Sequence, residues 1–342
     1  MGAPTARPGM VRGQGMAIRW PAEVDDVLKG DLTAALGYTT PAGGAVVTAV
    51  APCGLGDRDL GTIGFTTSLG FGRKLERIVA DPRVALAYHA REHGYSASPA
   101  FVLAQGVAAV DLTPSRAQLE SLTPQVERYL GKVVRGVVWD RLLREYYGER
   151  VLVDVAVKRI AAWPDLSASG EMTVTGPAWP GPADPQPPPK NGTGPRTDVD
   201  KAAGQVATLP HRVLAYRGAD GFPVMVPVHV AGHDRTGLRL VVPAGLLPPG
   251  GRRAGLLAHS YRPQLIGLST RVFTGWLEVS PDGAIYAPHT SKGFVAPPRK
   301  RLLLVSNGLL AKYGLWQARR QGTAARLAQL ASEREAAAAI SD

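Results

Sequence analysis

Short runs of apolar and β-branched residues, separated by glycine, proline and aspartate, recur along most of this chain. Runs of this length between turn residues predict β-strands. The strands are expected in two groups, at 45–52, 60–67, 83–90, 100–111 and 151–162, and at 210–217, 223–231, 237–243, 254–260 and 270–279. Helices are expected at 21–36, 72–80, 114–147, 299–313 and 322–338. The pattern predicts a mainly β protein with flanking α-helices.

The two groups of strands are related by an internal repeat. Seven identities recur at a separation of 178 residues. They match Leu36, Tyr38, Gly43, Val46, Val50, Gly54 and Leu60 with Leu214, Tyr216, Gly221, Val224, Val228, Gly232 and Leu238. At a shorter separation, Ala104-Gln105-Gly106 matches Phe273-Thr274-Gly275. A repeat of this kind indicates two copies of one structural unit. We therefore expect two small antiparallel barrels in tandem.

Composition suggests where the two units begin and end. The segment between them is rich in proline and glycine, which is typical of a linker. The expected boundaries are a disordered N-terminus at 1–19, a first barrel at 20–166, a linker at 167–205, a second barrel at 206–322 and a C-terminal helix or tail at 323–342.

Composition also limits the classes of function. The 342 residues, 45% of them apolar, suffice for two cores. A single cysteine, Cys53, excludes an intramolecular disulfide, and no stretch resembles a signal peptide or a membrane span, so we expect a cytoplasmic protein without a membrane partner. The net charge of +11 comes from scattered cations without a nucleic-acid-binding motif, so we expect no nucleic-acid partner. His229 and His233 lack a third nearby ligand, and we predict no metal site.

One segment has the composition of an anion site. Thr66-Thr67-Ser68 end a predicted strand, and Arg73-Lys74 begin the next predicted helix. Hydroxyls, the backbone N–H groups of a helix start and nearby cations together bind phosphate well. The same two cations also fit the solvated face of an amphipathic helix whose apolar side is Leu75, Ile78 and Val79. The sequence alone leaves both interpretations open.

In their order and spacing, several segments resemble the pyridoxamine 5′-phosphate oxidase-like, FMN-binding split-barrel superfamily. These segments are Val46-Val47-Thr48, Gly64-Phe65-Thr66-Thr67-Ser68, Arg73-Lys74-Leu75, Asp81-Pro82-Arg83-Val84-Ala85-Leu86, Gln105-Gly106 and Arg159–Pro164. The resemblance covers about residues 20–165 and, more weakly, 208–280. It implies two tandem split β-barrels that form an internal pseudo-dimer. The second is degenerate, because a proline- and glycine-rich segment replaces the Lys74 helix.

The resemblance also implies a site and an activity. By position, the phosphate of FMN would contact Thr66, Thr67, Ser68, Arg73 and Lys74, and the flavin ring would lie near Val46, Val47, Thr48 and Gln105. Phe65 is also expected among the cofactor-binding residues. The implied function is a flavin-dependent oxidoreductase that transfers hydride to or from a small organic substrate, with one cofactor per chain. No catalytic residue is identified. The alternatives are a deazaflavin coenzyme in place of FMN, or a non-catalytic flavin- or haem-binding or sensor protein. A further homodimer through the first barrel stays open.

Overall fold

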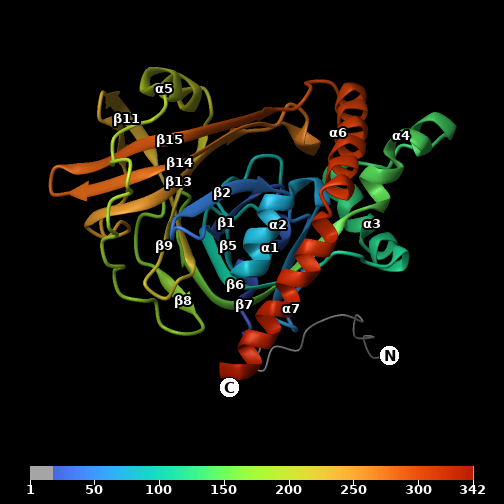
Figure 1. The fold of residues 1–342 in the computed structure, drawn as a ribbon, viewed down its shortest axis with the longest axis horizontal. Coiled ribbons are helices and arrows are strands. Elements are labelled where there is room, and N and C mark those ends of the chain that lie inside the picture. Colours follow the sequence, from blue (N-terminus) through green and yellow to red (C-terminus); the bar gives the residue numbers. More distant parts are fainter. Residues whose placement is uncertain (1–17, 342) are drawn as a thin grey trace.

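The chain folds into two antiparallel sheets with helices around them, as described for residues 18–341 by a computed structural model (Figure 1). The first sheet contains β1 (Ala34–Thr39), β2 (Ala45–Val50), β3 (Gly56–Asp57), β4 (Thr62–Thr67), β5 (Arg83–Tyr88), β6 (Phe101–Asp111), β7 (Val151–Trp163) and β8 (Thr173–Thr175). The second contains β9 (His211–Arg217), β10 (Pro223–Pro227), β11 (His229–Asp234), β12 (Gly237–Val241), β13 (Gly250–Ser260), β14 (Ser269–Ser280) and β15 (Gly283–Val295). The predicted mainly β fold is confirmed.

The two sheets have the same strand order. It is β2-β1-β5-β6-β7-β4-β3 in the first and β10-β9-β13-β14-β15-β12-β11 in the second. The register repeats as well, because Tyr38 lies opposite Val46 and Tyr216 lies opposite Val224. The predicted repeat is therefore real, and the architecture is consistent with two tandem split barrels.

A β-bulge recurs at the repeated glycines. The register shifts between Gln105 and Gly106 in the β6–β7 pair and between Thr274 and Gly275 in the β14–β15 pair. A Cβ atom would lie 2.4 Å from the carbonyl oxygen of Ala156 at the first glycine and 2.1 Å from that of Ala287 at the second. Only glycine permits the strands to approach so closely.

The helices flank the sheets. They are α1 (Ala22–Gly30), α2 (Gly72–Ala80), α3 (Arg116–Leu130), α4 (Val137–Gly148), α5 (Val199–Ala207), α6 (Lys300–Arg320) and α7 (Thr323–Ser341), with short 3₁₀ turns η1 (Leu69–Phe71) and η2 (Pro263–Leu265). Helix α2 is predicted correctly, and the second half has no helix between β12 and β13, as expected.

Several elements differ from the prediction, and the strand expected at 223–231 is the two strands β10 and β11. The first helix ends at Gly30 rather than residue 36, because 34–39 instead form β1 between β2 and β5. The long helix at 114–147 is two helices, separated by Gly131 and Gly136 at positive φ. Strand β15 is missing from the prediction altogether, although it pairs with both β14 and β12. In each case pairing or turn geometry outweighs local propensity.

The segment between the halves has some structure of its own. Strand β8 pairs with β7, and α5 packs against β11. Gln186 donates to the carbonyl oxygen of Gly43 and accepts from the backbone N–H of Arg253. The segment thus bridges the two sheets, while the predicted domain boundaries stay predictions. The predicted disordered N-terminus lies, except for residues 18 and 19, outside the described residues.

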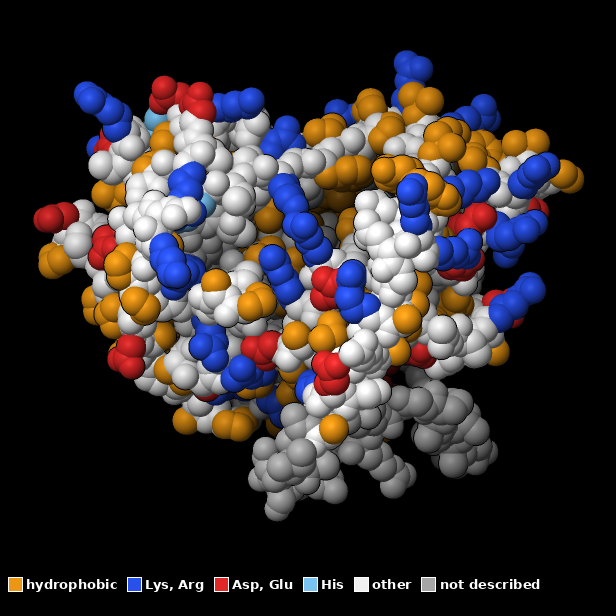
Figure 2. All heavy atoms as spheres, viewed as in Figure 1, with side chains coloured by type: hydrophobic (Ala, Val, Ile, Leu, Met, Phe, Trp, Pro, Cys, Tyr) orange, Lys and Arg blue, Asp and Glu red, His pale blue; other side chains and the backbone are white. Residues whose placement is uncertain are grey.

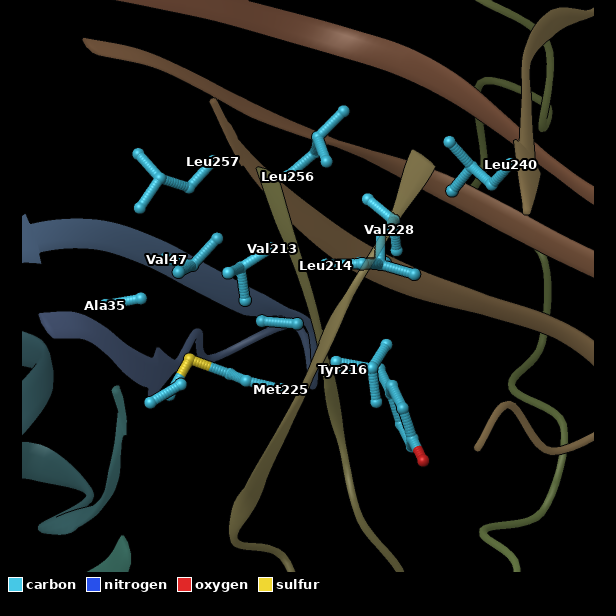
Figure 3. Close-up of a cluster of buried hydrophobic side chains, with 14 of the residues drawn as sticks. Ala35, Val47, Val213, Leu214, Tyr216, Met225, Val228, Leu240, Leu256 and Leu257 are labelled. Atoms are coloured by element: carbon cyan, nitrogen blue, oxygen red, sulfur yellow. The ribbon is translucent and has the colours of Figure 1, made fainter. Parts of the chain in front are cut away.

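A continuous apolar interface joins the two halves. Strand β2 packs against β13, β9 and β14, and Val47 shares one buried cluster with Val213 and Leu257 (Figure 3). The expected internal pseudo-dimer is therefore present. A second cluster fills the first barrel and includes Val46 and Phe65.

The C-terminal helices cross back to the first half. Helix α6 packs against α4 and η1, and α7 packs against α2 (Figure 1). None of the described helices is long and apolar enough to span a bilayer.

Candidate functional site

The predicted anion corner forms where β4 gives way to α2. Ser68 follows the strand, and its Oγ accepts a hydrogen bond from the backbone N–H of Gly70 at 3.2 Å. On the first turn of α2, Lys74 points back at the strand end, where its Nζ donates to Thr67 Oγ1 at 2.7 Å. The structure thus brings together the hydroxyls and one of the two cations that the sequence places here. Arg73, the other cation, is exposed.

A second cation enters the corner from a distant part of the chain. Arg150 precedes β7, which pairs with β4, and its Nη2 donates to Thr66 Oγ1 at 2.8 Å. Neighbouring threonines therefore each hold one cation. Arg150 is not predicted from the sequence, because only the pairing of β4 with β7 brings it to Thr66.

The positive charge of the corner is not neutralised. The Lys74 ammonium group lies over the rings of Phe71 and Phe65, at 4.8 and 5.8 Å from their centres, and forms no ion pair with any described residue. Burial and, secondarily, the charge of Arg150 lower the pKa of Lys74 to about 7. Two cations held together without a carboxylate favour a bound anion, which would restore the charge of Lys74.

The C-terminal helices close the corner. Glycines allow the approach, because a Cβ atom at Gly70 would lie 3.0 Å from the Cα of Gly314 in α6, and one at Gly72 would lie 3.1 Å from Cγ2 of Thr323 at the start of α7. Arg326 of α7 forms an ion pair with Glu76 of α2. Helices α6 and α7 therefore pack directly against the corner.

The other residues expected to bind the cofactor lie in two environments. Phe65 and Val46 are buried within the first barrel, and Val47 is buried against the second half. Thr48 follows on β2, and its Oγ1 is buried without a hydrogen-bond partner among the described residues. This hydroxyl is available to a ligand.

Gln105 lies where the two halves of the molecule meet. Its Nε2 donates to the carbonyl oxygen of Pro223 at 2.8 Å, and its Oε1 accepts from Arg159 Nη2 at 2.6 Å. Arg159 in turn forms an ion pair with Asp220. The Nε2 end of the Gln105 amide therefore contacts the second half directly, and the Oε1 end is linked to it through Arg159.

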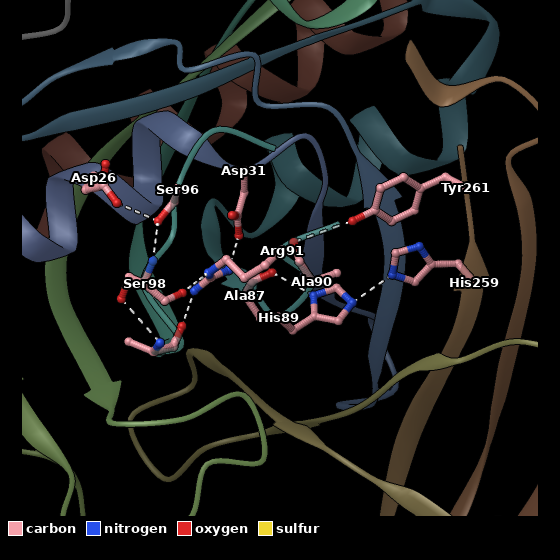
Figure 4. Close-up of polar contacts among 11 residues, drawn as sticks. Asp26, Asp31, Ala87, His89, Ala90, Arg91, Ser96, Ser98, His259 and Tyr261 are labelled. Carbon is pink, nitrogen blue, oxygen red and sulfur yellow. Dashed lines mark hydrogen bonds and ion pairs between the residues drawn. The ribbon is translucent and has the colours of Figure 1, made fainter. Parts of the chain in front are cut away.

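Histidines form another buried contact between the halves (Figure 4). His89 Nε2 lies 2.7 Å from His259 Nε2, and Tyr261 stacks on His259 at 5.6 Å between ring centres. Beside them, Asp31 pairs with Arg91, but burial dominates and raises the pKa of Asp31 to about 8. The sequence gives no signal for this cluster, because its members lie far apart along the chain.

Two open hollows lie away from the anion corner. One, of about 560 Å³, lies between α5 and the β14–β15 pair and includes Lys201 and Arg271. The other, of about 580 Å³, is lined by residues that include Asp200 and His233. Within residues 18–341, no group of three or more His, Cys, Asp or Glu side chains is arranged to hold a metal ion.

Comparison with known proteins finds similarity only among solved structures, since no family model and no curated protein matches. A conserved hypothetical protein from Mycobacterium tuberculosis is 22% identical over 46% of this chain and 91% of its own, with a TM-score of 0.33. A heme binding protein from Mycobacterium smegmatis is 14% identical over 86% of this chain and 100% of its own, with a TM-score of 0.31.

A pyridoxamine 5′-phosphate oxidase-related, FMN binding protein from Nostoc punctiforme is 9% identical over 58% of this chain and 87% of its own, with a TM-score of 0.27. All three structures are similar to this chain at low sequence identity. Their identities and TM-scores are too low to transfer a ligand or a residue's role to this chain.

Proposed function

We propose that this chain is a flavin-dependent oxidoreductase whose anion corner binds the phosphate of FMN. The observation that carries the proposal is the convergence of Lys74 and Arg150 on neighbouring threonine hydroxyls without a carboxylate to neutralise them. A deazaflavin coenzyme, which is also anionic, is the alternative cofactor. The substrate is a small organic molecule.

In this proposal each side chain of the anion corner has a defined role in binding the phosphate. Lys74 and Arg150 neutralise the phosphate, while Thr66 and Thr67 orient the two cations and Arg73 adds charge from the rim. Ser68 positions the turn whose N–H groups face the anion.

Other parts of the chain would contact the flavin ring and exclude water from it. The ring lies beside the backbone of Val46-Val47-Thr48 on β2, and the Thr48 hydroxyl, which has no partner among the described residues, contacts a polar ring atom. Gln105 is left out, because its amide is already used between the halves. A bound flavin supplies two-electron hydride chemistry, and the chain binds it, orients it and excludes water through α6 and α7.

The number of cofactors per chain and the cellular location are also part of the proposal. The segment Val242–Pro249 contains no helix equivalent to α2, so one cofactor binds per chain. The free, buried thiol of Cys53 fits a cytoplasmic location.

Titration with FMN and with riboflavin, which lacks the phosphate, tests the corner directly. We expect the chain to bind FMN more tightly, and Lys74→Ala and Arg150→Ala each to weaken FMN binding roughly 10- to 100-fold with little effect on riboflavin. Lys292→Ala, which removes an exposed lysine of β15, is the matched control and leaves both affinities unchanged. Equal affinity for the two flavins would show that the corner does not hold the phosphate.

The pH dependence of FMN binding provides a second readout. Because the pKa of Lys74 is lowered to about 7, its charge is lost as the pH rises above that value in the ligand-free chain. FMN affinity therefore falls between pH 7 and pH 9, and this fall disappears in Lys74→Ala. Reduction of the bound flavin by a pyridine nucleotide or a reduced deazaflavin then tests for an enzyme. Binding without any reduction would instead favour the non-catalytic flavin-binding protein.

A further inference from the structure

Helix α6 has apolar side chains on two opposite faces. On the inner face Leu304, Gly308 and Leu315 are buried against the first half of the molecule. The opposite side of the helix carries Leu302, Leu309, Tyr313 and Trp316, which are 52, 56, 61 and 53% exposed. Their spacing of seven, four and three residues places them in one stripe. A helix that is apolar on both faces is expected to be covered on both.

The neighbouring helix α4 extends this surface. Its Val137 and Val138 are 89 and 75% exposed, and α4 meets α6 where Leu142 contacts Gly308. Figure 2 shows apolar side chains gathered over α6 and α4, with Lys and Arg among them. We call this the outer face, and it comprises Val137, Val138, Leu302, Leu309, Leu310, Tyr313 and Trp316. A contiguous exposed apolar patch of this kind marks an interaction surface.

The charged residues of α6 are all basic, whereas α4 carries Asp140 close to Val137 and Val138, where it lies 4.0 Å from Arg135. Helix α6 contains Lys300, Arg301, Lys312, Arg319 and Arg320 and no acidic residue. Arg319 pairs with Glu149 at 2.6 Å, and Lys300 donates to Gln264. The other three form no ion pair with residues in the described part of the chain. The partner of this face therefore accepts apolar side chains and carries negative charge.

These two requirements select among the possible occupants. A second copy packed with its α6 against α6 would place two acid-free helices together, and like charges would repel. Nucleic acid would neutralise the cations but would leave leucine and valine exposed at its phosphates. The boundary of an anionic lipid layer meets both requirements, since it buries apolar and aromatic side chains beneath negative headgroups.

We propose that the outer face binds an anionic lipid surface, with α6 lying in the plane of the interface. Its 21 residues span about 31 Å along that plane. Trp316 and Tyr313 enter the interface, while Arg301, Lys312 and Arg320 remain at headgroup level. This inference revises the prediction of no membrane partner: the protein rests on the membrane and does not cross it. It does not depend on the proposed cofactor.

Sedimentation of the full chain with lipid vesicles tests the proposal. We expect binding to vesicles of phosphatidylcholine and phosphatidylglycerol in equal amounts, weakening as salt is added, and no binding to phosphatidylcholine alone. The double variant Leu309→Gln/Trp316→Gln should lose at least about tenfold in affinity. Lys312→Gln/Arg320→Gln should lose roughly thirtyfold.

A matched control separates the outer face from exposed apolar surface in general. Val241 is 56% exposed but lies on β12 in the second half, so Val241→Gln should bind vesicles as the natural chain does. Circular dichroism verifies that each variant is folded.

Several outcomes would overturn the proposal. These are equal binding to neutral vesicles, no binding to either kind, and retention on duplex DNA without vesicle binding. Light scattering can give one further contradicting outcome. If the natural chain is a dimer, if Leu309→Gln/Trp316→Gln dissociates it, and if neither form binds vesicles, then the outer face contacts a second copy of the chain.

Discussion

At the scale of single residues, the His89–His259 contact has a defined proton arrangement. His89 Nδ1 lies 3.0 Å from the carbonyl oxygen of Ala87, which can only accept, so this nitrogen holds a proton. In a neutral His89 ring, Nε2 then accepts from Nε2–H of His259. His259 Nδ1 is left as an acceptor, buried without a partner among the described residues. Because one of the two facing nitrogens must accept, this hydrogen bond is lost when both rings are protonated.

This arrangement predicts that acid weakens the fold. Burial, as the main cause, lowers the pKa of His89 to about 3 and that of His259 well below its ordinary value of 6.5. At pH values below 6.5 and above the lowered pKa of each ring, the unfolded chain binds protons that the folded chain does not. The free energy of unfolding therefore falls as the pH falls. The expected loss is about 2 kcal/mol per histidine between pH 7 and pH 5.

Urea unfolding at a series of pH values measures this loss. His259→Phe removes one titrating ring and should lessen the dependence on pH below 6.5, whereas His229→Gln, an exposed position on β11, should not. The same slope in His259→Phe and in the natural chain would show that the buried pair does not govern acid stability.

At the scale of elements, the recurring β-bulge shows that each half requires a glycine where its two long strands shift register. The alignment of Ala104-Gln105-Gly106 with Phe273-Thr274-Gly275, visible in the sequence, coincides with the register shift in both sheets. The bulge itself could not be predicted, because it depends on which strands pair. Strands β1 and β15 are missed for the same reason, whereas α2 is predicted correctly because its amphipathic pattern is local.

Substitution at this bulge should be costly. In Gly275→Ala the new methyl group would lie 2.1 Å from the carbonyl oxygen of Ala287, so the strands must separate. We expect the free energy of unfolding to fall by about 1–3 kcal/mol, measured by chemical denaturation. Gly204→Ala in α5 is the control, because no atom lies within 4 Å of its added Cβ. There, helix propensity predicts a gain of up to about 1 kcal/mol. Equal effects at the two glycines would contradict the steric argument.

At the scale of the whole molecule, the halves are joined by polar contacts as well as by the apolar interface. Arg159 of β7 binds Gln105 and pairs with Asp220, and Gln105 reaches Pro223 at the start of β10. The Arg159 side chain is buried, while Asp220 is partly exposed. Loss of the guanidinium therefore leaves the buried Gln105 oxygen without a donor.

We expect Arg159→Ala to lower the free energy of unfolding by about 2–3 kcal/mol and to reduce cooperation between the halves. Differential scanning calorimetry distinguishes the two effects: the natural chain should unfold in one transition and the variant in two. Arg235→Ala, at an exposed turn between β11 and β12, should change neither. A single unshifted transition in Arg159→Ala would show that the apolar interface alone joins the halves.

The sequence by itself determined the features that depend on neighbouring residues. These are the alternating strands, their repetition, the amphipathic α2 and the order of hydroxyls and cations from Thr66 to Lys74. Only the tertiary structure decided which distant residues meet. It pairs β7 with β4 and so brings Arg150 to Thr66, and it joins His89 to His259 across 170 residues. Local patterns follow from backbone geometry and side-chain polarity, whereas such contacts depend on how complete sheets and helices pack.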